Sequence, residues 1–141
     1  MSAEVLHVCI EGNISVGKST FLVKLSKEFI DQNVSHEMLV EPVDEWVCFG
    51  SSSLNLLEKM YHEPAKFSYN FQMAALITKN TQLQNAKGKN VLVERSIAAQ
   101  KNVFLPILVK NKAVTDLQYE ICKRYMNFME RVPGNSPDVI V

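Results

Sequence analysis

The sequence predicts an α/β fold in which a parallel sheet lies between two layers of helices. Short apolar runs of strand length alternate with longer segments of helical periodicity. The runs are almost continuously apolar, as expected of parallel strands that are covered on both faces. Strands that alternate with helices also imply crossover connections between parallel neighbours. We therefore expect a single three-layer α/β/α domain over residues 1–141, with about four strands.

The first half of the chain is expected to begin with a buried strand at residues 6–10. Apolar residues in 21–29 follow at helical spacing. Residues 34–40 fit a second strand, which stops before Pro42 because the residue preceding a proline favours an extended conformation. After a loop, two helices are expected, at residues 54–61 and 63–84.

The second half repeats this alternation. Residues 90–93 fit a covered parallel strand. A helix from Ser96 to about residue 108 is expected, although Pro106 should kink or interrupt it, and a strand in 103–109 is the alternative. Thr115 and Gln118 resemble a capping box at the start of another helix, and residues 137–141 begin what looks like a buried fourth strand.

Composition narrows the classes of function. Fifteen basic residues balance fifteen acidic ones, so no net field favours nucleic acid or a membrane surface as a partner. The three cysteines are far apart and have no metal-ligand spacing, which predicts free thiols in a reducing compartment. The first expected strand starts too close to Met1 for a leader segment, so we expect a cytoplasmic location, with mitochondria as the alternative.

The segment after the first expected strand is a complete G-x-x-x-x-G-K-[ST] phosphate loop (P-loop). The glycines let backbone N–H groups surround phosphate oxygens, the lysine reaches the terminal phosphates, and the serine hydroxyl helps to hold Mg²⁺. The alternative, a glycine-rich turn without a ligand, fits the strand–loop–helix order less well. The residues expected to bind the phosphates of ATP are Gly12, Asn13, Ile14, Ser15, Val16, Gly17, Lys18, Ser19 and Thr20.

Charged residues also follow two other expected strands, Glu41 after the second and Glu94 with Arg95 after the third. Ligands of parallel α/β sheets bind beyond the carboxyl ends of the strands, so these residues should converge on the phosphate loop. Phosphoryl transfer needs positioning, cations and often a base. We assign Lys18 to the donor phosphates, Ser19 and Glu94 to Mg²⁺, Arg95 to the transferring or acceptor oxygen, and Glu41 to the acceptor's proton. An acceptor with a planar base would need flat apolar walls and a hydrogen-bonding reader, which Trp46, Phe71, Phe104 and Gln72 can supply if they do not simply fill the core.

These residues together resemble the deoxyribonucleoside kinase family, which includes deoxyguanosine, deoxycytidine and mitochondrial thymidine kinases. Four separated blocks carry the resemblance in the same order and at similar spacing. They are residues 10–20, residues 41–43 with Trp46, residues 55–72, and residues 94–96.

The resemblance implies ATP-dependent phosphorylation of the 5′-hydroxyl of a deoxyribonucleoside, with Mg²⁺. Glu41 would act as the base on that hydroxyl, and Arg95 would lie beside it, while Glu94 would help to organise the metal. Gln72 would read the base edge in a bidentate manner. The remaining implied contacts are Phe71 and Phe104 around the base, Trp46 and Leu57 on the pocket wall, and Tyr61 at the sugar 3′-hydroxyl.

Three departures from the family pattern bear on specificity, assembly and rate. Purine-accepting members carry an arginine and an aspartate near the base, where Lys79 and Gln100 keep polarity here without copying that pair. Residues 15–16 and 61–64 look most similar to the deoxyguanosine kinase branch, so we expect purine tolerance. Pro106 is unusual in the fourth expected helix and affects the expected homodimer contact. Family members continue into a fifth strand and an arginine-rich lid, so the resemblance implies a domain that is incomplete at its C-terminal end. The arginines here are Arg95, Arg124 and Arg131, so we expect weak turnover from these residues.

Three hypotheses remain open on the sequence. The first is a deoxyribonucleoside kinase. The second is a catalytically inactive homologue that binds nucleotides or a longer partner. The third is another P-loop nucleotide kinase, for which Gln72 and Trp46 would be incidental. Turnover of nucleosides, binding without turnover, and acceptance of monophosphates alone would separate the three.

Overall fold

The computed structural model describes residues 4–12 and 17–141. Within them lies one sheet of four parallel strands in the order β2-β3-β1-β4. The strands are β1 (His7–Ile10), β2 (Glu37–Leu39), β3 (Val91–Glu94) and β4 (Val139–Ile140). The predicted parallel α/β sheet is therefore confirmed. In this sheet Cys9 of β1 lies beside Val93 of β3, and Val93 lies beside Leu39 of β2. The carboxyl ends of these three strands therefore meet at one edge of the sheet.

Alternate strand residues face opposite helical layers, as the period of a strand requires. Val8, Ile10 and Leu92 pack against Leu22 of the first helix. On the other face, Leu39, Val91 and Val93 pack against Leu83 and Ala86 near the end of the long helix α4. The sheet is thus the middle layer of three, and its burial follows from the apolar runs of the sequence.

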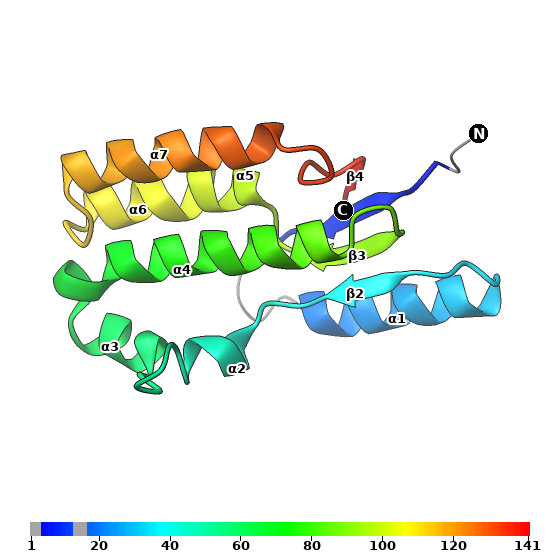
Figure 1. The fold of residues 1–141 in the computed structure, drawn as a ribbon, viewed down its shortest axis with the longest axis horizontal. Helices are drawn as coiled ribbons and strands as arrows, with labels where there is room; N and C mark the ends of the chain where they lie inside the picture. The colour runs from blue at the N-terminus through cyan, green and yellow to red at the C-terminus, as the bar shows by residue number, and fades with distance from the viewer. Residues whose placement is uncertain (1–3, 13–16) are drawn as a thin grey trace.

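Helices make up most of the described chain, and several continue well past the strand ends, away from both termini (Figure 1). A separate helical core there joins Leu76, Leu105 and Met126 from three of the helices. Among the described residues no helix is both long and apolar enough to cross a membrane. The helices are α1 (Lys18–Asp31), α2 (Val43–Trp46), α3 (Leu56–His62), α4 (Pro64–Asn85), α5 (Ile97–Ala99), the π-helical turn η1 (Gln100–Phe104), α6 (Leu105–Lys110) and α7 (Asp116–Arg131).

Local sequence signals account for several helix starts. Thr115 accepts a hydrogen bond from the Gln118 N–H while the Gln118 side chain accepts one from Thr115 N–H, which confirms the predicted capping box of α7. Pro64 lies in the first turn of α4, where its missing N–H removes no helical hydrogen bond. The predicted second strand is shorter than expected, since only residues 37–39 pair with β3.

Pro106 does not break the helical run from 97 to 110, and the alternative strand at 103–109 is wrong. The turn before it is widened to a π-helix, in which the Leu105 N–H donates to the carbonyl of Gln100. A new α-helix then begins at Leu105, so that Pro106 falls in its first turn. A proline is tolerated there because the first N–H groups of a helix have no partner within it.

The fourth strand differs from the expectation in its burial. Val139 and Ile140 pair with β1, but both side chains are exposed, Ile140 by 59%. The apolar run predicted cover on both faces, whereas β4 lies at the edge of the sheet, where a strand has a neighbour on one side only.

Protonation of His7 is expected to destabilise the fold below pH 6.5. The side chain is 8% exposed, and burial lowers its pKa from 6.5, against a smaller opposing effect of Asp138. The unfolded chain therefore binds the proton more readily, and the free energy of unfolding falls as pH drops through the unfolded pKa. Urea unfolding measures this effect. Between pH 7.5 and pH 5.5 the free energy of unfolding should fall by more for the native chain than for His7→Gln. Equal losses would contradict this, and His62→Gln, at an exposed site, should behave as the native chain does.

Candidate active site

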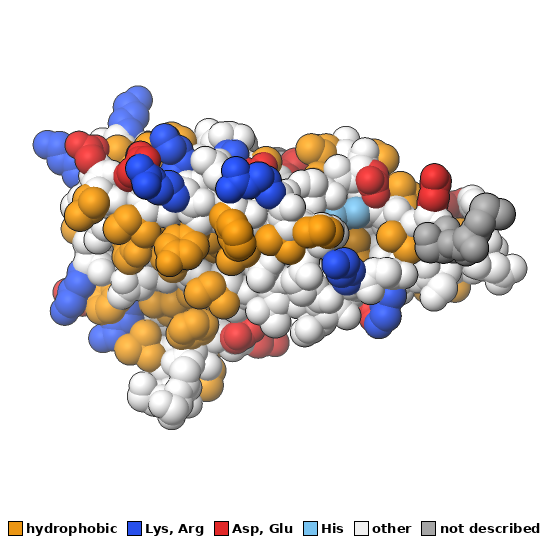
Figure 2. All heavy atoms as spheres, turned by 45° about the horizontal axis from the view of Figure 1, so that its top comes forward, with side chains coloured by type: hydrophobic (Ala, Val, Ile, Leu, Met, Phe, Trp, Pro, Cys, Tyr) orange, Lys and Arg blue, Asp and Glu red, His pale blue; other side chains and the backbone are white. Residues whose placement is uncertain are grey.

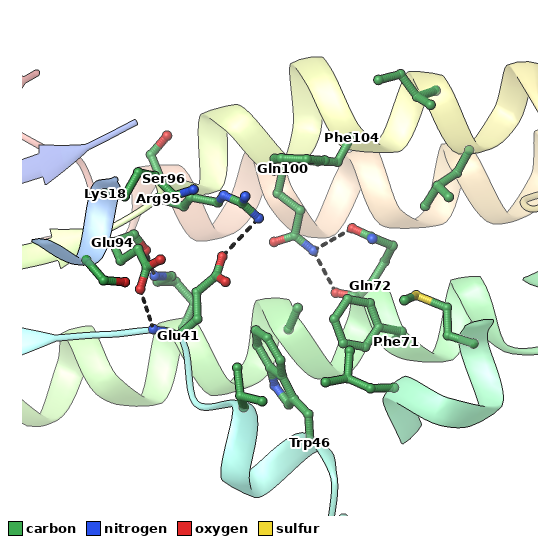
Figure 3. A pocket seen from close by; sticks show the side chains of 18 of the residues that line it. Lys18, Glu41, Trp46, Phe71, Gln72, Glu94, Arg95, Ser96, Gln100 and Phe104 are labelled. Atoms are coloured by element: carbon green, nitrogen blue, oxygen red, sulfur yellow. Dashed lines mark hydrogen bonds and ion pairs between the residues drawn. The ribbon is translucent and has the colours of Figure 1, made fainter. Parts of the chain in front are cut away.

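A cavity of about 740 Å³ lies beyond the carboxyl ends of the strands, at the edge predicted from the parallel topology. Its volume falls in the range of pockets that enclose a small organic ligand. Five parts of the chain line it, namely the start of α1, the segment after β2 with α2 and α3, α4, the segment after β3, and η1 with α6 (Figure 3). The predicted site residues in its lining are Gly17, Lys18, Ser19, Thr20, Glu41, Trp46, Leu57, Tyr61, Phe71, Gln72, Lys79, Glu94, Arg95, Gln100 and Phe104.

The start of α1 supplies the end of the cavity expected to bind phosphates. Gly17 is its N-cap with φ of 87°, a left-handed conformation that strongly favours glycine. Lys18 is buried in the structure, whereas the predicted binding of donor phosphates requires its ammonium to reach a ligand. Unpaired N–H groups at a helix N-terminus favour anions. Gly12 is described but is not part of the cavity lining, and the predicted phosphate contacts at Asn13, Ile14, Ser15 and Val16 lie outside the described residues.

Glu41, Glu94 and Arg95 come together at the carboxyl ends of β2 and β3, as their positions in the sequence predicted. Arg95 Nη1 lies 3.1 Å from Glu41 Oε1, and both side chains are largely buried. The Glu41 N–H donates to Glu94 Oε2 at 3.3 Å, which ties the segment after β2 to the end of β3 (Figure 3). A carboxylate and a guanidinium are thus held in contact inside the cavity.

Lys79, for which the resemblance implies a place near the base, lines the cavity and reaches this charged group. Its ammonium donates to the main-chain carbonyl of Glu94 at 2.5 Å, from inside α4. Burial lowers the pKa of Lys79, and the nearby Glu41 carboxylate opposes that shift. The resemblance places both Lys79 and Gln100 near the base, and within the described chain the hydrogen bonds of the two side chains go to different partners. The length and flexibility of the lysine side chain let it reach the strand end, which spacing along the helix could not indicate.

The apolar wall consists mainly of Trp46 and Phe71. Their rings meet edge to face, with centroids 5.0 Å apart and planes at 78°. Trp46 is 7% exposed, and its indole N–H donates to Thr78 Oγ1 at 3.2 Å, which fixes the ring. Tyr61 is 71% exposed, so its part of the lining is at the solvent side of the cavity.

Gln72 and Gln100 form a hydrogen-bonded pair of side-chain amides (Figure 3). Gln100 Nε2 donates to the main-chain carbonyl of Gln72 at 2.8 Å and to its Oε1 at 2.9 Å. The main-chain carbonyl oxygen of Gln72 can only accept a hydrogen bond, so the NH₂ end of the Gln100 amide must face it. The Gln72 amide oxygen must then face the same NH₂ group. Beside this pair, the Arg95 guanidinium lies 4.6 Å from the centroid of the Phe104 ring.

Sequence reasoning missed several residues of the cavity wall. Ala75 lies one helical turn after Gln72, and Met60 one turn after Leu57, so helical spacing could have identified both. No sequence signal marked Thr78 as the partner of Trp46. The other cavity residues that were not predicted are Val43, Ser96, Ile107 and Leu108.

The donor set suits a magnesium ion that is held mainly by phosphates. Ser19 and Glu94, the two predicted ligands, both line the cavity. No group of three or more His, Cys, Asp or Glu side chains able to hold a metal occurs in the described part of the chain. Mg²⁺ usually takes only one or two carboxylates together with substrate phosphates and water, so one carboxylate and one hydroxyl fit this ion.

The parallel sheet, the helix N-terminus after β1 and the charged strand ends are those of an α/β fold of the P-loop class. The chain belongs to the deoxynucleoside kinase family, because the family model matches residues 8–141. The predicted resemblance is therefore confirmed.

Curated relatives agree with this family. The chain is 31% identical to a probable deoxycytidine kinase of Fowlpox virus (strain NVSL), over 86% of this chain and 48% of the viral protein. It is 28% identical to human mitochondrial thymidine kinase 2, over 95% of this chain and 48% of that protein. It is 26% identical to human deoxycytidine kinase, over 92% of this chain and 56% of that protein. The chain thus spans about half the length of these relatives.

Proposed function

We propose that the protein phosphorylates the 5′-hydroxyl of a deoxyribonucleoside, with ATP as the phosphate donor. One observation carries the proposal: a single cavity holds Lys18 at the start of α1, the Glu41–Arg95 pair, and an aromatic wall with side-chain amides. The first group suits phosphates, the second a reacting hydroxyl and the third a planar base. The relatives are named as kinases of deoxycytidine and thymidine, which supports this class of acceptor.

The residues divide the work by their chemistry. Glu41 accepts the proton of the attacking 5′-hydroxyl, and Arg95 holds the oxygen atoms on which negative charge develops. Lys18 and the first N–H groups of α1 bind the donor phosphates. Magnesium bound by Ser19 and Glu94 would neutralise phosphate charge. In the free protein Arg95 also keeps Glu41 oriented, since the two groups are in contact.

The base contacts follow from the other half of the cavity. Trp46, Leu57 and Phe71 form one wall, and Phe104 lies on the η1 side. Gln72 supplies a donor and an acceptor for the base edge. Tyr61, at the solvent side of the cavity, contacts the sugar in this proposal. Lys79 acts at the strand ends instead of at the base, because its ammonium is bound to the Glu94 carbonyl.

The direct test is phosphoryl transfer from ATP to a panel of the four deoxynucleosides, with binding measured on the same samples. Formation of a 5′-monophosphate supports the proposal. Tight nucleoside binding without turnover would favour an inactive nucleotide-binding homologue. Use of nucleoside monophosphates while nucleosides are refused would favour another P-loop nucleotide kinase.

Gln100→Glu is expected to reverse the order of affinities between bases with an exocyclic amino group and bases with an exocyclic oxygen. A carboxylate has no N–H to give to the Gln72 carbonyl or Oε1, so the Gln72 amide must turn its Nε2 toward residue 100. The positions of donor and acceptor presented to the base are then exchanged. Since an unpaired buried polar group costs about 1–3 kcal/mol, ratios of affinity should change by about tenfold or more.

Calorimetric titration with deoxyadenosine and deoxyguanosine, and with deoxycytidine and thymidine, measures this change. Gln100→Leu is the control, because it removes the donor without recruiting Nε2, and all affinities should fall together. An unchanged order in the glutamate variant would show that Gln100 does not set the direction of the Gln72 amide.

A second copy of the chain is the partner that we propose for the outer face of α7. Leu117, Tyr125 and Phe128 recur on one face of this helix and are 71%, 49% and 56% exposed. Figure 2 shows hydrophobic side chains in a row among Lys and Arg on the side of the molecule where α7 lies. Sedimentation velocity over a range of concentrations tests the homodimer.

A cytoplasmic location stays a prediction from the sequence.

A further inference from the structure

Glu11 links the strand that leads into the phosphate loop to the turn that carries Arg95. Its main-chain N–H donates to the carbonyl of Val141 at 2.9 Å, which places it at the end of β1. Its Oε1 accepts the N–H of Ser96 at 2.8 Å and the thiol of Cys9 at 3.3 Å. The next residue, Gly12, is the first of the phosphate loop. One carboxylate therefore joins two segments that are 85 positions apart in the chain.

Arg95 needs such support because its backbone is strained. Its φ is 63°, in the left-handed region that residues with a Cβ seldom adopt. Such conformations persist only where the surroundings impose them. Two hydrogen bonds flank the residue: the Arg95 N–H donates to the Ile10 carbonyl at 2.9 Å, and the next N–H donates to Glu11. The peptides on both sides of Arg95 are thus fixed by the end of β1.

This backbone conformation determines where the guanidinium lies. From this turn it reaches Glu41 at 3.1 Å and stacks 4.6 Å from the Phe104 ring centroid. Its Nε is buried and has no hydrogen-bond partner among the described residues, so the side chain's own contacts do not fully hold it. Loss of the bond at Ser96 would let the turn relax and move Arg95 away from the cavity.

We propose that Glu11 is a positioning residue, which holds Arg95 in its left-handed conformation and so aims its guanidinium at the acceptor hydroxyl. Ser96 Oγ caps α5 by accepting the N–H of Ala99, whereas the Ser96 N–H donates to Glu11. The hydrogen bond to Glu11 is therefore separate from the helix cap. The role of Glu11 in the reaction rests on the proposed function, whereas its effect on the conformation of Arg95 does not.

The first test follows the Arg95 side chain directly by NMR. The chain has three arginines, of which Arg124 and Arg131 lie on α7, so three Nε–H signals are expected. Burial should make the Arg95 signal slow to exchange with solvent. In Glu11→Leu this signal should shift and exchange at least tenfold faster, and Glu11→Gln, which keeps an acceptor oxygen, should lie between. An unchanged Arg95 signal in a folded Glu11→Leu chain would overturn the proposal. Glu4→Gln, at an exposed position before β1, is the control.

The second test separates backbone strain from side-chain contacts. It uses Glu11→Gln, so it can be carried out even if Glu11→Leu does not fold. Glycine adopts the left-handed conformation without strain, whereas alanine does not. The shift in urea midpoint caused by Glu11→Gln should therefore shrink to less than half in an Arg95→Gly background and persist in Arg95→Ala. Equal shifts in both backgrounds would contradict the proposed support of Arg95.

The functional arm measures nucleoside turnover. Glu11→Gln should lower kcat about tenfold with little change in KM for ATP, because the carboxylate acts through Arg95 and not on the donor. A loss confined to the KM for ATP would instead place Glu11 with the phosphate loop and refute the role. If the native chain shows no turnover, the proposed function fails, while the NMR and unfolding tests still decide whether Glu11 positions Arg95.

Discussion

Replacing Glu41 by glutamine is expected to reduce phosphoryl transfer by about 10²–10⁴-fold, the usual contribution of a positioned general base. An amide cannot accept the proton of the 5′-hydroxyl, but it is nearly the same size as the carboxylate. It can still accept a hydrogen bond from Arg95, so the shape of the cavity should survive. Nucleoside affinity is therefore expected to stay within a few-fold of the native value.

The measurement is kcat and KM for the best nucleoside of the panel, with affinity measured separately by calorimetry. Glu45→Gln is the matched control, because Glu45 lies on α2 in the same part of the chain and is exposed. It should leave kcat unchanged. A Glu41→Gln variant that keeps full turnover would remove Glu41 from the reaction, and equal losses in both variants would point to an effect of charge alone.

Leu76→Ala is expected to lower the free energy of unfolding by about 2–5 kcal/mol, as for other large-to-small changes in protein cores. Leu76 is fully buried, in the helical core that also contains Leu105 and Met126. Shortening it leaves a cavity among helices that come from separate parts of the chain. Natural domains are stable by only about 5–15 kcal/mol, so this single change should remove a large share of the total.

Ile77→Ala offers a close comparison, since Ile77 is the next residue of α4 but is 53% exposed. Its cost should be small because surface substitutions rarely exceed about 0.5 kcal/mol. Urea unfolding followed by circular dichroism measures both variants. Equal costs would show that the helical core is not packed as described. Because α4 also carries Phe71, Gln72 and Lys79, weaker nucleoside binding is expected from Leu76→Ala near its unfolding midpoint.

The charged part of the site could be predicted because topology determines it. Glu41 follows β2 and Glu94 is the last residue of β3, in the same parallel sheet, so the rule for strand ends was sufficient to bring them together. The amide pair could not be predicted in the same way. The bonds from Gln100 to Gln72 depend on the widened η1 turn and on the separation of two helices, and neither leaves a local pattern.

The sequence by itself determined the order of the strands and longer helices, the capping of α7 and the parallel sheet, because apolar periodicity and helix capping act between residues close along the chain. It did not indicate the short helix α2, where a loop was expected. Only the tertiary structure decided which group the Lys79 ammonium contacts, how the turn at Arg95 is held and which strand lies at the edge of the sheet. Each of these depends on groups that are distant in sequence and meet only after the helices pack. Glu11 illustrates the difference: it stands beside the most recognisable motif of the chain, yet its carboxylate acts on a turn that only folding brings to it.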